Sequence, residues 1–195
     1  MARTKDFDEN EVLTKAMNQF WSRGYSATSM EDLVSSLGIS RSSLYDTYVD
    51  KHTLFIKALE HYQQMGYAKI QDILKSPGSS KETVKRLIEH ATCGSSASGK
   101  QTGCFLVNAE VEVAPHDKKV SKLICNNGEQ MEDIFYQVIK NGQKTGDVKN
   151  PRNARSLARF ITNTIKGLQV TAKSTFDKAG FNEIIGMTVS ILDQN

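Results

Sequence analysis

The chain has 195 residues, of which 38% are hydrophobic and 24% are charged, and its formal net charge is +3. These proportions are typical of a folded protein and predict one medium-sized domain, or a small domain joined to a larger one. No apolar run approaches the roughly 20 residues that a membrane-spanning helix needs, so we expect no membrane association. The three cysteines form no CxxC pair, which argues against a disulfide framework or a zinc site and favours the cytoplasm.

The charge is unevenly distributed along the chain. Residues 1–60 carry seven Lys and Arg against nine Asp and Glu, a net of −2, whereas residues 61–195 carry a net of +5. Non-specific attraction to nucleic acid depends on positive charge. If the first sixty residues bind DNA, they therefore do so through the placement of individual side chains.

Apolar residues at helical spacing predict three short helices followed by a long one in the N-terminal part of the chain. The first helix should end at Gly24, and the sequence Thr28–Glu31 has the pattern of a capping box that opens the second helix. Gly38 should end this second helix, and Ser40 can cap the third. Asp50 is the expected N-cap of the long helix.

The remainder of the chain also has the pattern of helices. A break at SPGSS, residues 76–80, contains a second capping-box pattern formed by Ser79 and Glu82. No run of alternating apolar residues with hairpin turns predicts a sheet. The expected fold is therefore all-α, with about nine helices. The later helical segments are expected near residues 104–114, 118–142, 151–176 and 181–193.

The segment SSLGISRSSLYDTY, residues 35–48, joins two of the short helices through Gly38. If Leu44 and Tyr48 pack inward, a rotation of about 100° per residue turns the small polar side chains outward. Short hydroxyl groups near a helix N-terminus can hydrogen-bond phosphates and base edges in a DNA major groove. Two short helices with a third behind them predict a helix-turn-helix. A solvated polar face is the alternative interpretation.

Several features of residues 24–59 agree together in spacing and in residue type. They are the GY-x-x-T opening at 24–28, Glu31-Asp32-Leu33, Gly38-Ile39-Ser40, Leu44-Tyr45, Tyr48, Lys51 and Leu54-Phe55. This region resembles the N-terminal signature of the TetR/AcrR family of bacterial transcriptional regulators. The resemblance covers residues 7–60 of the chain.

The resemblance implies a repressor that binds double-stranded DNA as a homodimer and is released by a small-molecule effector, without a cofactor or a metal. The DNA-binding domain would comprise residues 1–50, and a helical effector and dimerisation domain would comprise residues 51–195. A two-fold dimer implies a near-palindromic operator. An effector would shift the long fourth helix and so change the separation of the two DNA-binding domains.

The resemblance also implies which side chains contact DNA. The residues expected to face the major groove are Ser42, Ser43, Tyr45 and Thr47. The residues expected to contact phosphates are Thr28, Ser40, Arg41 and Lys51. Arg3 and Lys5 would form a basic arm that adds backbone contacts. Asp46 departs from a simple DNA-binding face, since it would point at the DNA. There it could accept a hydrogen bond from cytosine, be tolerated through water, or act as a specificity element that disfavours misplaced binding on phosphates.

The sequence TGCFLVNAE, residues 102–110, is similar to a Gly-Cys-Leu-x-x-Asn stretch in a TetR subgroup of which some members respond to electrophiles or oxidants. Cys104 is therefore a candidate sensor. Its expected position at a helix N-terminus, with Lys100 nearby, should lower the pKa of the thiol. The alternative is a buried cysteine that acts as a small apolar residue.

The effector pocket is expected among helices within residues 55–170, with an apolar or aromatic ligand, because these helices offer few charged partners. Besides Cys104, the candidate lining residues are Tyr62, Met65, Phe105, Met131, Phe135 and Tyr136, each of which could instead be ordinary core. The apolar stripes of the last two helices predict a four-helix dimer interface. The alternative is that both apolar stripes are buried in the core of a single subunit.

Two other functions are weaker alternatives. An enzyme is not expected, because the four histidines are scattered and no HExxH or GxSxG motif is present. His61 and His90 are expected on solvated helix faces, and the pair of Cys104 and His116 is the remaining candidate for nucleophile and base. The third interpretation is a helical adaptor that no longer binds DNA, which Asp46 and the negative charge of residues 1–60 favour.

Overall fold

The computed structural model describes residues 7–93, 102–175 and 177–194, and all regular structure in these ranges is helical. This confirms the predicted all-α class. Arg3, Lys5 and Lys100 lie outside the described residues. The helices are α1 (Glu9–Arg23), α2 (Met30–Leu37), α3 (Arg41–Tyr48), α4 (Lys51–Lys75), α5 (Ser80–Cys93), α6 (Phe105–Glu112), α7 (Lys118–Thr145), α8 (Ala154–Thr171), α9 (Lys178–Ser190) and the short 3₁₀ helix η1 (Ile191–Asp193).

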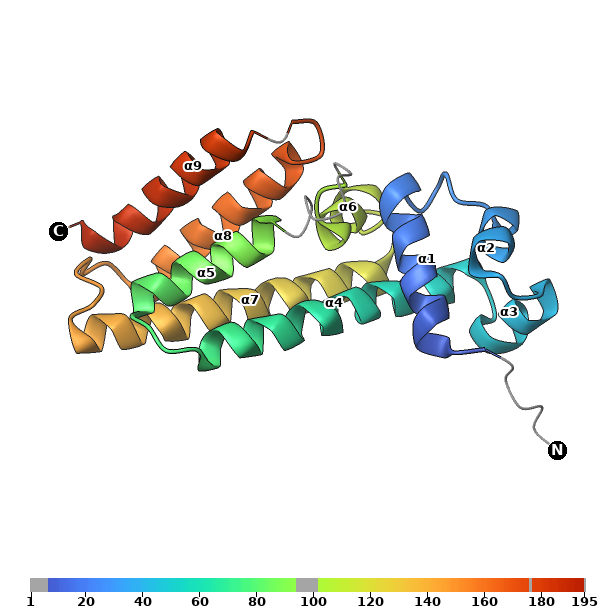
Figure 1. Cartoon of the computed structure of the whole chain (residues 1–195), viewed down its shortest axis with the longest axis horizontal. Helices are drawn as coiled ribbons and strands as arrows, with labels where there is room; N and C mark the ends of the chain where they lie inside the picture. Colours follow the sequence, from blue (N-terminus) through green and yellow to red (C-terminus); the bar gives the residue numbers. More distant parts are fainter. Residues whose placement is uncertain (1–6, 94–101, 176, 195) are drawn as a thin grey trace.

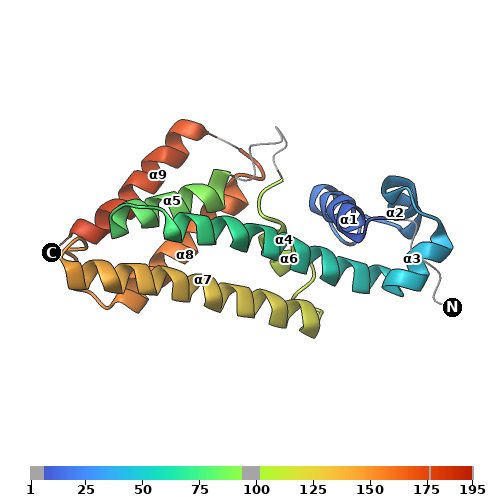
Figure 2. The same ribbon diagram turned by 60° about the horizontal axis from the view of Figure 1, so that its bottom comes forward.

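The molecule is elongated, and the long helices α4 and α7 run along its length (Figure 1). Helices α1, α2 and α3, which we call the N-terminal unit, gather around the first turns of α4 at one end. Helices α5, α8 and α9 cover the other end, and α6 lies between the two groups (Figures 1 and 2). Within the described ranges, no helix has both the length and the apolar character needed to cross a bilayer.

Three helices, α3, α4 and α5, begin at the predicted capping residues. The carboxylate of Asp50 accepts the N–H of Thr53 at 2.7 Å at the start of α4. Ser79 and Glu82 form the predicted reciprocal pair before α5, in which the N–H of Ser79 lies 2.8 Å from the Glu82 carboxylate. Each of these bonds satisfies a backbone N–H that has no partner within its helix, so short polar side chains fix where the helices start.

The capping box of α2 lies one residue later than predicted. Ser29 is the N-cap, and the Asp32 carboxylate accepts its N–H at 2.8 Å while the Ser29 hydroxyl accepts the N–H of Asp32 at 3.1 Å. Thr28 is fully buried instead, and its hydroxyl donates to the carbonyl of Gly24 at 2.7 Å. The prediction was wrong because aspartate, rather than Glu31, takes the N3 position of the box.

The first hydrophobic core joins the N-terminal unit to α4, α6 and the start of α7. Leu44 and Tyr48 of α3 point inward, with 0% and 1% of their surface exposed, as predicted. The same cluster continues through Phe105 of α6, whose ring meets that of Phe55 edge-on at a centroid distance of 5.7 Å. It extends to Ile124 of α7. This core therefore crosses the domain boundary that we predicted after residue 50.

Val49 connects α3 to α4 in a strained turn. Its φ and ψ angles are 65° and −54°, and the N–H of Asp50 donates to the carbonyl of Tyr48 at 2.6 Å, which closes a three-residue γ-turn. A positive φ is unfavourable for a β-branched residue. Among the described residues, Val49 is the one non-glycine residue with a positive φ. The turn reverses the chain directly after α3, so that Asp50 can cap α4.

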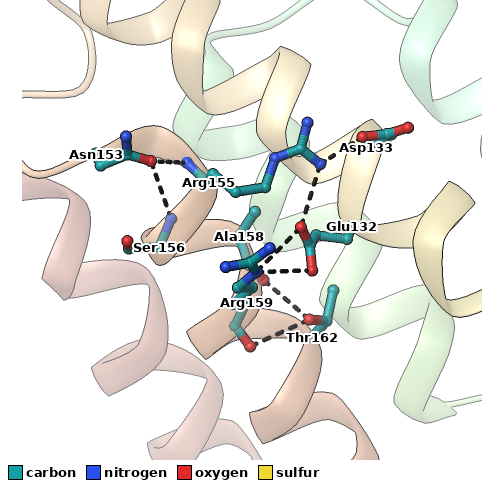
Figure 3. Close-up of polar contacts among 8 residues, drawn as sticks. All are labelled: Glu132, Asp133, Asn153, Arg155, Ser156, Ala158, Arg159 and Thr162. Carbon is teal, nitrogen blue, oxygen red and sulfur yellow. Dashed lines mark hydrogen bonds and ion pairs between the residues drawn. The ribbon is translucent and has the colours of Figure 1, made fainter.

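The second hydrophobic core lies among the end of α4 and helices α5, α7, α8 and α9. Ion pairs cover its edge between α7 and α8 (Figure 3). The Glu132 carboxylate accepts hydrogen bonds from Arg155 and Arg159 at 3.2 Å each, and Asp133 also binds Arg155. The side chain of Asn153 caps α8 at the same place. Both apolar packing and paired charges therefore hold α7 against α8.

Candidate nucleic-acid interface and ligand cavity

Helix α3 exposes one polar face. Its two buried residues, Leu44 and Tyr48, anchor the opposite face in the first core. The structure thus agrees with the orientation predicted for this helix. The exposed side chains are Arg41, Ser42, Tyr45 and Asp46, while Ser43 and Thr47 are partly exposed.

Ser40 organises the N-terminus of α3. Its hydroxyl oxygen lies 2.9 Å from the hydroxyl oxygens of both Ser42 and Ser43, and it accepts the N–H of Ser43 at 3.1 Å. Three hydroxyl groups therefore meet at the positive end of the helix dipole. Such a cluster can donate hydrogen bonds to a phosphate oxygen without steric obstruction.

Two basic side chains flank this face and lie over tyrosine rings. The guanidinium carbon of Arg41 is 5.9 Å from the ring centroid of Tyr45, and the ammonium of Lys51 is 4.3 Å from that of Tyr25. Burial lowers the pKa of Lys51, and the Glu112 carboxylate opposes this effect. Lys51 opens α4 beside the end of α3, where a cation can approach a phosphate.

Thr28 does not fit the predicted phosphate contact. Its side chain is fully buried, and its hydroxyl already donates to the carbonyl of Gly24. The structural role of Thr28 is to close the turn between α1 and α2. The exposed Ser29 occupies the start of α2 instead.

A cavity of about 690 Å³ is lined by α1, α4, α5, α6, α7 and α8. Its wall combines aromatic, aliphatic and sulfur-containing side chains with a few polar ones, which is typical of a small-molecule site. Among the predicted effector residues, Tyr62, Met65, Cys104, Met131 and Phe135 line it.

Phe105 and Tyr136 were also candidates for the pocket wall, with ordinary core as the alternative, and neither lines the cavity. Phe105 begins α6 and packs into the first core. Tyr136 lies outside the cavity, where its hydroxyl accepts a hydrogen bond from Lys140 at 2.8 Å and its ring lies 4.1 Å from the guanidinium carbon of Arg155. Neighbouring residues of one helix can face the core, the cavity or solvent. The apolar character of a side chain does not reveal which of these it faces.

Cys104 lines the cavity but does not fit the predicted reactive thiol. Only 7% of its surface is exposed, and it accepts a hydrogen bond from the hydroxyl of Tyr62. Burial raises the pKa of the thiol, although the backbone N–H of Val107 acts in the opposite direction. The N-terminus of α6 therefore favours the thiolate, as predicted, but desolvation outweighs this effect.

Two carboxylates at the cavity are already paired. Lys166 donates to both carboxylate oxygens of Glu110, at 2.7 and 2.9 Å, and Glu132 is bound by the arginines of α8. His90, which we predicted on a solvated face, lines the cavity instead, and burial lowers its pKa. The wall also includes a third carboxylate, Glu129, so the charges at the cavity are only partly paired among the described residues.

Sequence reasoning missed several wall residues. Met17 and Trp21 reach the cavity from α1, which we had assigned to DNA binding alone. Gly66 of α4 and Gly128 of α7 also line it, and a Cβ at either position would meet nothing within 4 Å. Glycine within a helix costs about 1 kcal/mol relative to alanine. The two mid-helix glycines were therefore a feature of the sequence that could have indicated the open space of the cavity.

A capped, outward-facing α3 held by two neighbouring helices, followed by a helical domain with a cavity, defines a helix-turn-helix transcriptional regulator. Comparison with known proteins specifies the family. Residues 12–58 match the family model described as bacterial regulatory proteins, tetR family. Residues 80–186 match the model of the tetracyclin repressor-like C-terminal domain. The chain belongs to the TetR family.

Individual relatives match nearly the whole chain. It is 31% identical to YezE of Bacillus subtilis, an uncharacterised HTH-type transcriptional regulator, over 99% of this chain and 100% of YezE. It is 28% identical to the HTH-type transcriptional repressor ComR of Escherichia coli, over 97% and 90% of the two chains. A cysteine mutant of the TetR-family regulator CifR, solved with a 26-bp double-strand operator DNA, superposes with a TM-score of 0.85 at 25% identity, over 96% and 98% of the chains.

Proposed function

We propose that the chain is a homodimeric repressor that places α3 in the major groove of a near-palindromic operator and releases it when a neutral apolar or aromatic compound occupies the cavity. The orientation of α3 carries this proposal. Its apolar residues are buried in the first core, and every residue expected to face the groove remains at least partly exposed. Short side chains on such a face allow the helix to approach base edges closely.

The relatives support the DNA-binding and repressor roles. ComR is a repressor, and CifR binds a double-strand operator. The groove contacts of this chain would come from Ser42, Ser43, Tyr45 and Thr47. Ser40, Arg41 and Lys51 would contact phosphates. Such a protein acts on DNA in the cytoplasm.

Exposed apolar residues on α8 and α9 support the homodimer. Phe160 and Val170 of α8 are 53% and 54% exposed, and Ile184 and Met187 of α9 are 42% and 73% exposed. Large apolar side chains on two adjacent helices are suited to a four-helix interface across a two-fold axis. The dimer would present two copies of α3 to successive major grooves.

The cavity supports a neutral effector that binds without a covalent bond. It offers the rings of Trp21, Tyr62 and Phe135, and its Glu110 and Glu132 carboxylates are already paired. The buried Cys104 thiol, with its raised pKa, favours this mode over reaction with an electrophile.

Selection of duplexes from a random-sequence pool tests the proposal. The full-length protein should enrich one near-palindromic sequence, and its affinity for that duplex should fall steeply as the salt concentration rises. Enrichment of no sequence would overturn the DNA-binding role and favour the helical adaptor.

A further inference from the structure

Both ends of α6 are hydrogen-bonded to the end of α1 and to the segment that leads from it into α2. Just before α6, the carbonyl of Gly103 accepts the indole N–H of Trp21 at 3.2 Å. At the last residue of α6, the Glu112 carboxylate accepts the N–H of Ser26 at 2.8 Å and the N–H of Tyr25 at 3.1 Å. We call these bonds the α6 attachment. They join residues more than eighty positions apart in the sequence.

The Glu112 end of the α6 attachment is closely fitted. Gly24 has a φ of +87°, and a Cβ at this position would lie 2.9 Å from Oε2 of Glu112. Burial raises the pKa of Glu112, but the N–H groups of Ser26 and Tyr25 outweigh this effect and hold the pKa below its ordinary value. Glu112 is therefore a carboxylate at neutral pH, and it accepts both hydrogen bonds in its charged form.

The middle of α6 lines the cavity. Leu106, Val107 and Glu110 form part of its wall, and Trp21 contributes to the wall from α1. A compound in the cavity would therefore contact α6 and the end of α1 at the same time. Figure 1 shows α6 directly between α1 and the helices of the C-terminal half.

The segment held by the α6 attachment also reaches the DNA-binding face. Tyr25 lies beneath the ammonium of Lys51, and Ser29, four residues further along, caps α2. A displacement of Glu112 would carry the backbone of Tyr25 and Ser26 with it. Both the support of Lys51 and the start of α2 would then change.

We propose that an occupant of the cavity changes DNA affinity through the α6 attachment, with Glu112 as the positioning residue, rather than through the contact that joins the start of α4 to the residue before α7. This inference rests on the proposed function and specifies how its two sites are coupled. The competing connection is the contact between His52 of α4 and Asp117, which precedes α7. One substitution removes the Glu112 end of the α6 attachment, and one substitution removes the His52 contact, so the two can be compared directly.

The experiment uses the neutral naphthalene dye prodan as the cavity probe and the duplex selected by the wild-type protein. Trp21 is the only tryptophan of the chain, so energy transfer from tryptophan to the dye reports occupancy next to Trp21. The dissociation constant of prodan is measured with and without the duplex. By linkage, the ratio of the two constants equals the effect of the dye on DNA affinity.

We expect a ratio of about fivefold or more in the wild type, which is the lower range of allosteric coupling. Glu112→Ala should bring the ratio close to one, and Glu112→Gln, which keeps one acceptor oxygen, should lower it partly. Both variants should bind prodan normally in the absence of DNA. His52→Ala should keep the wild-type ratio.

Energy transfer first establishes that the dye is bound near Trp21 in the wild-type protein. If its dissociation constants with and without the duplex are then equal, the inference is overturned. The inference would also be wrong if Glu112→Ala kept the ratio, or if His52→Ala lost it. A failure of the proposed function is distinguishable, because the protein would then select no duplex before any dye was added. Thermal unfolding of each variant verifies that the compared proteins are folded.

Discussion

The phenolic hydroxyl of Tyr62 donates a hydrogen bond to Sγ of Cys104 at 3.6 Å, so the candidate sensor thiol is an acceptor inside the cavity. Burial raises the pKa of this thiol, and little thiolate should form at neutral pH. We expect Cys104 to react with the thiol reagent DTNB at least about tenfold more slowly than an exposed cysteine at pH 7. The measurement uses Cys93→Ser/Cys125→Ser, in which Cys104 alone remains.

The control for this rate is Cys93→Ser/Cys104→Ser, which leaves the exposed Cys125. The rate of Cys104 should rise with pH well above neutrality, because the thiol remains protonated until its raised pKa is reached. Equal rates for the two thiols at pH 7 would restore the sensor hypothesis.

Tyr45→Ala and Lys51→Ala should both weaken binding to the selected duplex while the dimer stays intact. The loss of one phosphate contact in Lys51→Ala should reduce the slope of log affinity against log salt by about one unit. Tyr45→Ala should instead keep the slope, since it removes no cation. Fluorescence anisotropy at several salt concentrations measures both effects, and wild-type affinity in both variants would refute the assignment of this face.

Met187→Glu should dissociate the dimer, because it places a charge in the proposed α8–α9 interface. Val111→Glu is the matched control, since Val111 on α6 is equally exposed at 73% but lies on a different surface. Sedimentation velocity should show a monomer for the first variant and a dimer for the second. A dimeric Met187→Glu protein would place the interface elsewhere.

Gly24→Ala should lower the free energy of unfolding by about 2–3 kcal/mol, because the φ of +87° and ψ of 166° lie in a region that only glycine enters easily. A methyl group would also push Glu112 from its hydrogen bonds. Gly146→Ala is the control, with a φ of +80° but no atom within 4 Å of the added Cβ, and it should cost about 1 kcal/mol. Urea unfolding gives both values. Equal costs would contradict both the backbone strain and the contact with Glu112 that distinguish Gly24 from Gly146.

Asp32 should make stability depend on pH in acid. Hydrogen bonds from the Ser29 hydroxyl, the Ser29 N–H and Arg23 lower its pKa from 3.8 to about 2. The unfolded chain therefore takes up this proton at a higher pH than the folded protein. The stabilisation is fully present above pH 3.8 and is lost as the pH falls towards 2.

Asp32→Asn should accordingly flatten the decline of the urea midpoint between about pH 4 and pH 2. Asp46→Asn, at an exposed aspartate of α3, should leave the decline as it is in the wild type. Identical pH profiles for wild type and Asp32→Asn would contradict the role of the α2 capping box.

The sequence predicted the parts of the fold that depend on local interactions. Ser40, Asp50 and Ser79 cap their helices because a short side chain reaches a backbone N–H two or three residues away. The inward position of Leu44 and Tyr48 follows from helical periodicity. Thr28 shows the limit of this reasoning. Two adjacent hydroxyl residues compete for one cap, and the burial of Thr28, with its bond to the carbonyl of Gly24, decides between them.

The candidate site was less accessible from the sequence. Tyr62 and Met131 line the cavity as predicted, but Phe105 and Tyr136 do not, because only the packing of α6 and α7 determines which residues face inward. The protonation state of the Cys104 thiol depends on the balance between the helix dipole and desolvation. A local sequence motif does not reveal how deeply the residue is buried. The bonds from Glu112 to Tyr25 and Ser26 link distant segments, so no spacing rule could reveal them.

The continuity of the first core across residue 50 limits how this regulator can be recombined with its relatives. Phe105, Val113 and Ile124 complete the apolar interior beneath α1, α2 and α3. A chimaera joined at the end of α3 would expose these surfaces to mismatched neighbours, since packed interiors tolerate changes of shape poorly. Exchange of operator specificity is therefore better engineered by grafting the outward residues of α3 onto the intact chain.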